Sequence, residues 1–413
     1  MNTGSQIKGE QNLAVIKWLT FLMFMMFAMT TDAVGVIIPE VMKQFQVSMT
    51  AAGLMHYTPM IAIALAGVFL GFLADKLGRK VTVILGLAIF AVNSYLYIAA
   101  NTFGFILSLM AIGGLAIGVF KTGALALIGD ISKSTRDHTS MMNAVEGFFA
   151  VGAIIGPFIV TNFLSKGVAW QFLYVVAGTL CVILIILALL VEYPKTIKTT
   201  EEAVNLKAAL SMLKDPYALG FSIGAFLYVA VECAVYVWMP TLISKYEGNL
   251  VLIATYALTI FFVLRAGGRF FGAWLLVHFN WSVVLVIFSF LILLCFLGSV
   301  IGGIEMAVVL LPLSGLFMSV IYPTINSKGI SCFPKAQHGA IAGVILFFTA
   351  AGAALGPLSM GAVSDACGHD AYYGFILATI FAGLLFVGLI LNLLLDPTYQ
   401  RLSELELTQY REI

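Results

Sequence analysis

Twelve apolar stretches of helix length recur along the 413-residue sequence and constrain its fold more than any other feature. A helix needs about 20 predominantly apolar residues to cross the hydrocarbon core of a bilayer. The composition agrees, because 61% of the residues are hydrophobic and only 10% are charged, a balance that soluble domains do not have. We therefore expect an all-α membrane protein with twelve transmembrane helices. The predicted spans are residues 16–40, 51–74, 81–100, 104–128, 141–164, 169–192, 217–241, 249–274, 281–301, 305–327, 339–363 and 371–395.

One long polar interruption, YPKTIKTTEEAVNLKAALSMLKD at residues 193–215, divides the spans into six and six. The predicted organisation is therefore an N-terminal six-helix half at 1–192 and a C-terminal six-helix half with a short tail at 216–413. The polar stretch between them is expected to be a central loop.

The two halves share short sequence features at an almost constant offset, which indicates an internal repeat. Transporters built from two six-helix repeats hold their substrate near the bilayer midplane, where the repeats meet. The repeat therefore predicts a central site for a small molecule. The matching features, 200 or 201 residues apart, are GAIIGP (152–157) with GAALGP (352–357), Gly114-Leu115 with Gly315-Leu316, and Pro39 with Pro240.

The distribution of Lys and Arg over the loops predicts the orientation. Loops on one side carry only Lys43, Lys166 and Lys245, whereas the other side holds most of the basic residues. Basic loop residues favour the cytoplasmic side, so both termini and the central loop are expected in the cytoplasm of a multi-pass inner (plasma) membrane protein. The first apolar run, from Ile16, is too long for a signal peptide and lacks a cleavage site.

Six ionisable residues fall inside the predicted spans: Asp32, Lys121, Glu146, Glu232, Arg265 and Lys328. A charge at the centre of a bilayer costs about 2.5–3.5 kcal/mol or more, and such residues usually mark substrate or ion pathways. Asp32 and Glu232 each precede a repeated proline, by seven and eight residues, in the first helix of their half. We predict that Asp32, Glu232 and Glu146 couple transport to an ion. The alternative is that these charges pair, Asp32 with Lys121 for example, and only hold helices together; such pairs add little stability over apolar packing.

The remaining intramembrane charges are cations that suit an anionic substrate. A fixed cation at the midplane binds a carboxylate by charge-assisted hydrogen bonds, so a sugar acid or other small organic anion is a candidate beside a neutral sugar. Lys328 lies near a helix end, and snorkelling to the interface is the alternative for it. The predicted substrate-binding residues are Lys121, Arg265, Lys328, Asn143, Tyr228, Trp238, Tyr322 and Asn326.

Other classes of function find no support in the sequence. A formal net charge of +1 gives no reason to expect nucleic acid as a partner, and five cysteines without paired spacing predict neither disulfides nor a metal site. No G-x-x-x-x-G-K-[ST] motif is present, so the energy source is expected to be an ion gradient. No cofactor and no enzymatic activity are predicted, and we expect a monomer.

The segment GFLADKLGRK at residues 71–80 resembles the loop signature of the major facilitator superfamily, G-x-L-a-D-r-x-G-r-k. Together with twelve spans and the six-plus-six repeat, the resemblance covers essentially the whole chain. It implies alternating access, with this loop as a conformational gate. Asp75 is then expected to face the start of the eleventh helix near His338, where the helix dipole favours a negative charge. The expected gating residues are Gly71, Asp75, Gly78, Arg79 and Lys80.

Within that superfamily, FFAVGAIIGP, GVAWQFLYVVAG and FLYVAVECAVYVWMP resemble the fucose permease and glucose/galactose group of sugar symporters. This resemblance implies uptake of a sugar or sugar acid with a proton, or with Na⁺. The chain has Lys121 where fucose permeases place a carboxylate in the fourth helix. Drug or metabolite efflux by a proton antiporter of the same fold is the alternative. Such antiporters usually carry GP-x-x-GG in span five, and here Gly156-Pro157 is followed by FIVTN. A non-transporting sensor on this scaffold is a third possibility.

Overall fold

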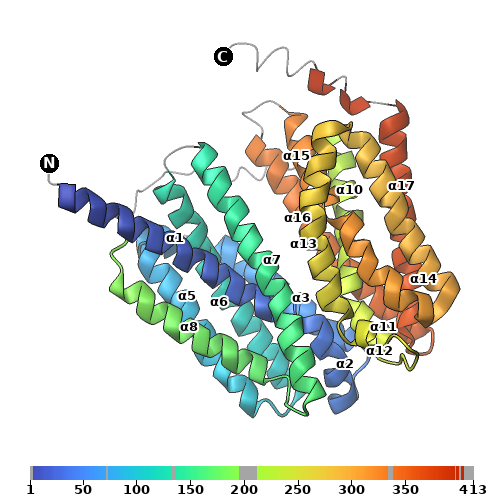
Figure 1. The fold of residues 1–413 in the computed structure, drawn as a ribbon, viewed down its shortest axis with the longest axis horizontal. Helices are drawn as coiled ribbons and strands as arrows, with labels where there is room; N and C mark the ends of the chain where they lie inside the picture. The colour runs from blue at the N-terminus through green and yellow to red at the C-terminus, as the bar shows by residue number, and fades with distance from the viewer. Residues whose placement is uncertain are drawn as a thin grey trace. The chain divides into compact units, whose positions relative to one another are not determined.

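The fold is all-helical in the computed structural model, which describes residues 3–70, 73–132, 135–194, 212–333, 338–395, 397–399 and 401–403 (Figure 1). The described residues contain no strand. The chain divides into two compact units, one of Met1–Val47 with Leu54–Thr200 and one of Ser48–Gly53 with Glu201–Ile413.

The first unit is built from the helices of the N-terminal half. They are α1 (Thr3–Thr31), α2 (Val34–Phe45), α3 (Met49–Leu70), α4 (Leu73–Lys76), α5 (Arg79–Leu96), the 3₁₀ turn η1 (Tyr97–Ala99), α6 (Phe103–Ile131), α7 (Thr135–Ser165) and α8 (Phe172–Leu190). The first residues of α3 belong to the second unit, because the backbone N–H groups of Met49 and Thr50 donate to the Asp365 carboxylate at 3.0 and 2.8 Å.

The second unit repeats the pattern with more interruptions in its helices. They are α10 (Pro216–Cys233), the π-helical turn η2 (Ala234–Trp238), α11 (Met239–Ile243), α12 (Val251–Thr255), α13 (Ala257–His278), α14 (Trp281–Met318), α15 (Ile321–Ser331), α16 (His338–Ala366) and α17 (Ala371–Leu395).

The described helices contain 11 stretches apolar and long enough to span a membrane. One of them, Trp281–Ser331, is 51 residues long and covers both the ninth and the tenth predicted spans. Gly303 separates the two with φ 65° and ψ −159°, a conformation that only glycine adopts at little cost. The predicted fold of twelve transmembrane helices in two six-helix halves is therefore confirmed.

In the first unit, the two glycines of the repeated motif, Gly152 and Gly156, lie at the contact between α7 and α1. A side chain added at Gly152 would collide with the carbonyl oxygen of Met25, and one at Gly156 with that of Met29. Lipid tails are as apolar as the helix surfaces, so helix association in a membrane depends on close packing, which small residues permit. The glycines of GAIIGP thus let the backbones of α7 and α1 approach closely.

The second unit uses the second copy of the motif in the same way. A Cβ at Gly352 of α16 would lie 2.5 Å from the Phe226 carbonyl oxygen of α10, and one at Gly356 would lie 2.6 Å from the Ala230 Cβ. Each half therefore packs its fifth helix on its first through the same pair of glycines.

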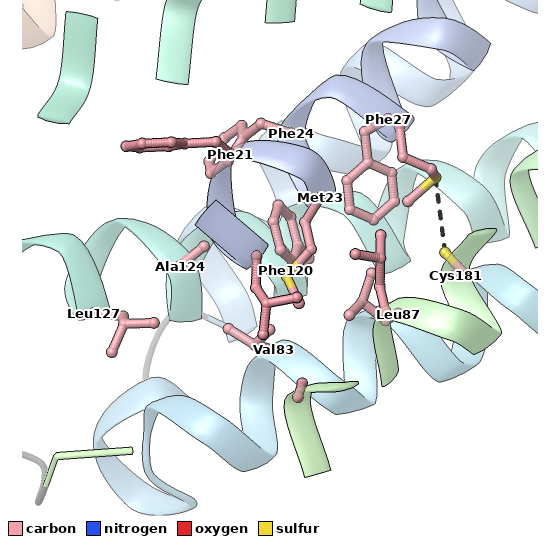
Figure 2. Close-up of a cluster of buried hydrophobic side chains, with 14 of the residues drawn as sticks. Phe21, Met23, Phe24, Phe27, Val83, Leu87, Phe120, Ala124, Leu127 and Cys181 are labelled. Atoms are coloured by element: carbon pink, nitrogen blue, oxygen red, sulfur yellow. Dashed lines mark hydrogen bonds between the residues drawn. The ribbon is translucent and has the colours of Figure 1, made fainter. Parts of the chain in front are cut away.

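An aromatic cluster fills the interior of the first unit. Figure 2 shows Phe24 and Phe27 of α1 beside Phe120 of α6 and Leu87 of α5. The rings of Phe24 and Phe27 lie 5.1 and 4.6 Å from that of Phe120, between centroids. Dispersion between such closely packed rings holds α1, α5 and α6 together. Phe120, at the centre of these contacts, directly precedes Lys121 on α6.

Replacing Gly156 by Val tests the close approach of α7 and α1. We expect a lower midpoint of thermal unfolding, because overpacking a helix contact costs about 1–3 kcal/mol. Gly147→Val, on the same helix but with open space around it, is the matched control and should melt like the parent. Fluorescence-detected size-exclusion chromatography after heating measures both. Equal midpoints for Gly156→Val and the parent would contradict the assignment.

Candidate functional site

The second unit holds a buried ion pair between its first and second membrane helices. Arg265 Nη2 of α13 lies 2.6 Å from Glu232 Oε1 of α10, with 21% of the Arg265 side chain and 9% of the Glu232 side chain exposed. An ion pair this close and this dry is strongly charge-assisted. The structure thus brings together two of the residues that the sequence singled out, the predicted coupling carboxylate and a predicted substrate-binding cation.

Tyr228 completes this cluster from one helical turn below Glu232. Its hydroxyl oxygen lies 2.7 Å from Glu232 Oε1 and 2.7 Å from the carbonyl oxygen of Met318. A hydroxyl has one proton to donate and can also accept a hydrogen bond. Tyr228 can therefore donate to an ionised Glu232, or donate to Met318 while accepting a hydrogen bond from a neutral Glu232.

The backbone after Glu232 departs from α-helical geometry. Residues Ala234–Trp238 form the π-helical turn η2, and such turns occur frequently at functional sites. Trp238 at its end is fully buried, and its indole N–H donates to the Pro357 carbonyl at 2.9 Å. This contact ties the turn to α16 and gives Trp238 a protein partner.

Tyr322 and Asn326 follow on α15. The Tyr322 ring stacks on that of Tyr228 at a centroid distance of 6.2 Å, and its hydroxyl accepts a 3.4 Å hydrogen bond from Thr349. Asn326, one turn further on, is half-buried. The predicted aromatic residues Tyr228 and Tyr322 thus lie next to the ion pair, within the same unit.

The first unit carries its own charged cluster around Lys121. The Lys121 ammonium lies 5.7 Å from the centroid of the Phe149 ring, within reach of a cation–π interaction. The carboxylates of Glu146 and Asp32 both act on it electrostatically, Glu146 more strongly. Of these two carboxylates, Glu146 is exposed and Asp32 is half-buried.

Asp32 stands at a break between two helices. Helix α1 ends at Thr31 and α2 begins at Val34, and the Thr31 hydroxyl donates to Asp32 Oδ2 at 2.8 Å. The Asp32 side chain is half-buried, so it is neither solvated as on a surface nor sealed in the core. The side chain of Asn143, another predicted site residue, lies outside the described residues.

Part of the predicted gating loop can be placed. Gly78 adopts φ 86° at the turn into α5, where only glycine is unstrained. Arg79 Nε donates to Asp130 Oδ2 of α6 at 2.9 Å, with 4% and 8% of the two side chains exposed. The Lys80 ammonium donates to the carbonyl oxygens of Leu189 and Val191 at the end of α8. The loop thus ties α5 to α6 and α8.

The remainder of the gate prediction lies outside the described residues. Gly71 and the side chains of Asp75 and His338 are not among them, so the expected contact with the eleventh helix stays a prediction. Asp130, the buried partner of Arg79, was missed in the sequence. The signal was there, since Asp130 is a carboxylate directly after an apolar run of helix length.

The described contact of the Lys328 side chain is with Trp281 and involves neither Glu232 nor Arg265. Its ammonium is 5.9 Å from the centroid of the Trp281 ring, at the start of α14. Lys328 itself is in the last turn of α15. This position fits the snorkelling alternative better than a place beside Glu232 and Arg265.

Comparison with known proteins gives relatives with different cargoes. The chain is 24% identical over 371 residues to the quinolone resistance protein NorA of Staphylococcus aureus, covering 84% of this chain and 89% of NorA. It is also 24% identical over 403 residues to the L-fucose-proton symporter of Escherichia coli strain K12, covering 87% and 89%. Both relatives span nearly the full length of the chain.

A solved structure with the same fold is that of a bacterial homologue of the human lysosomal transporter Spinster, in an inward-facing and unoccupied conformation. Its TM-score is 0.74 at 15% identity, covering 95% of this chain and 98% of that one. A model of the Major Facilitator Superfamily matches residues 20–357. With this match, the confirmed fold and the loop at residues 71–80, the chain belongs to the major facilitator superfamily of membrane transporters.

Proposed function

We propose that this transporter takes up a sugar or sugar acid together with a proton. The observation that carries the proposal is the ion pair between Arg265 and Glu232. It combines a cation that suits a substrate carboxylate with a carboxylate that can take up a proton. Na⁺ is the alternative coupling ion.

The pair suggests how substrate and proton are coupled. An ionised Glu232 competes with a substrate carboxylate for Arg265. Protonation of Glu232 removes that competition, and Tyr228 can adjust by donating to the Met318 carbonyl instead. Proton and anion then arrive together, and the site keeps its net charge. This matters because moving an unbalanced charge through a low-dielectric interior is costly.

The cluster in the first unit provides a second charged region of the same kind. Lys121 carries the cation, with Asp32 and Glu146 as the carboxylates that act on it. Besides Glu232, we assign ion coupling to Asp32, with Glu146 on the exit path, and substrate binding to Lys121. Tyr322 and Asn326, both half-buried, are proposed to offer an aromatic face and an amide to a sugar, and Asn143 is proposed as a further binding residue.

Efflux is the second candidate function. The relatives support it as much as uptake, because NorA and the L-fucose-proton symporter are equally similar to the chain. Two fixed cations, Lys121 and Arg265, favour an anionic cargo and disfavour a cationic drug, since like charges repel strongly where the dielectric constant is low. These cations are the reason to prefer an acid as the cargo, and the resemblance to the sugar symporters is the reason to prefer uptake.

We place the protein in the inner (plasma) membrane as a monomer, with both termini cytoplasmic, on the basis of the basic loop residues. The loop at 71–80 is the proposed gating element on that side. The arrangement of Arg79 and Lys80 supports this, because both anchor the loop to helices of the first unit.

Replacing Arg265 by Gln tests its role in substrate binding. We expect affinity for an anionic substrate to fall about 10- to 100-fold, because hydrogen bonds between charged groups contribute about 1.5–3 kcal/mol. A neutral analogue should lose much less, and Arg265→Lys, which keeps the charge, should retain part of the affinity for the acid. Thermal-shift titration with sugar acids and the matching sugars measures this. Equal losses for acid and neutral analogue would argue against direct binding.

Replacing Asp32 by Asn tests ion coupling, because Asn imitates a permanently protonated Asp. The variant should still exchange labelled for unlabelled substrate across proteoliposomes but should not concentrate it against a gradient. Glu40→Gln, on α2 and outside the charged cluster, is the control and should accumulate substrate like the parent. If Asp32→Asn also accumulates substrate, Asp32 is not the coupling site and Glu232 becomes the remaining candidate.

A further inference from the structure

The second unit contains an apolar cavity that the transport mechanism does not use. It has a volume of about 500 Å³ and lies between the start of α10 and the end of α17, with Trp281 of α14 and Ile325 of α15 completing its wall. Cavities of this size commonly hold small molecules. Its walls are almost entirely apolar, unlike the charged cluster around Glu232 and Arg265, so a sugar or sugar acid would find few hydrogen-bond partners there.

The internal repeat explains how the cavity arises. Gly220 and Gly224 of α10 line it, and the offset of 201 residues that relates Pro39 to Pro240 pairs them with Leu19 and Met23 of α1. Leu19 and Met23 are buried members of the cluster that fills the first unit, and Met23 is labelled in Figure 2. The second unit has glycines where the first has two large side chains.

Space remains open around these glycines. A side chain added at Gly220, or at Gly388 on the α17 wall, would meet no atom within 4 Å. The rim of the cavity is apolar and exposed, with Leu395 of α17 72% and Ile223 of α10 43% accessible. Both side chains are exposed on helices long and apolar enough to span the bilayer, so the acyl chains of lipids suit this rim.

Two cations lie against aromatic residues of the cavity wall. The Arg401 guanidinium stacks 4.4 Å from the centroid of Tyr217, and the Lys328 ammonium lies 5.9 Å from that of Trp281. Arg401 is paired with Asp215 at 3.0 Å. Among the described residues, no carboxylate forms an ion pair with Lys328. The described part of the rim therefore carries two cations and one carboxylate, Asp215.

These cations are at the level where a lipid headgroup would lie. Helix α10 begins at Pro216, α14 begins at Trp281 and α17 ends at Leu395, so the cavity opens at helix ends. Basic residues next to aromatic ones at helix ends are typical of the membrane interface, and basic pockets between helices bind anionic headgroups.

We propose that the cavity holds an acyl chain of an acidic phospholipid, with the lipid phosphate against Lys328 and Arg401. The apolar volume accounts for the chain, and Lys328, which forms no ion pair with a described carboxylate, accounts for the headgroup. A zwitterionic lipid fits the same volume but gains less from the rim. The site is separate from the proposed substrate site and does not depend on which substrate is carried.

Competition between two lipids tests the proposal on the full-length protein. Purified, delipidated protein is incubated with equimolar phosphatidylglycerol and phosphatidylcholine of identical acyl chains, and the retained lipid is identified by native mass spectrometry. The parent should retain phosphatidylglycerol preferentially, and Lys328→Gln should lower that preference by about fivefold, as expected for one interfacial cation.

Filling the cavity should abolish retention of either lipid. Gly220→Leu and, independently, Gly388→Leu insert a side chain into open space, and Gly104→Leu, at an equally open position in the first unit, is the matched control. Loss of retention in the first two variants but not in the third supports the site. Retention by both filled variants at the level of the parent would overturn it, as would a parent without preference between the two headgroups.

Discussion

The ion pair between Arg265 and Glu232 answers to two opposing requirements of an ion-coupled membrane transporter. A charge in the bilayer interior must be compensated, yet a transporter must also change its charge state in order to couple an ion to its cargo. At 2.6 Å, each residue compensates the other, and in the proposed mechanism a substrate carboxylate takes the place of Glu232 beside Arg265. Tyr228 can hydrogen-bond either protonation state of Glu232, so the cluster tolerates the change.

Around the charged clusters, each unit is held together by packing, because lipid provides no hydrophobic driving force between helices. The glycines of GAIIGP and GAALGP make the close contacts of α1 with α7 and of α10 with α16. The interiors differ, however. Leu19 and Met23 fill the first unit, whereas the glycines at the repeated positions in the second leave a cavity. The repeat thus conserves the contacts between helices while allowing the space between them to diverge.

The fold was predictable from the sequence because a bilayer imposes a local rule: every span must be apolar and about 20 residues long. Pairing was harder. Which carboxylate meets which cation depends on how α10 and α13 are rotated about their axes, and the hydropathy pattern does not encode that rotation. Glu232 and Arg265 were both recognised, but their contact was not, and Asp130 was missed as the partner of Arg79. Gly303, which separates the ninth and tenth spans, looks in the sequence like one glycine among 39.

Proton uptake on substrate binding measures the exchange of partners at Arg265 most directly. Purified protein in weakly buffered detergent solution, with a pH-sensitive dye, is mixed with an anionic substrate near neutral pH. If the substrate carboxylate displaces Glu232 from Arg265, Glu232 becomes protonated, and the parent should take up close to one proton per substrate bound. Glu232→Gln should bind the substrate without taking up a proton. The same uptake in the parent and in Glu232→Gln would contradict the account.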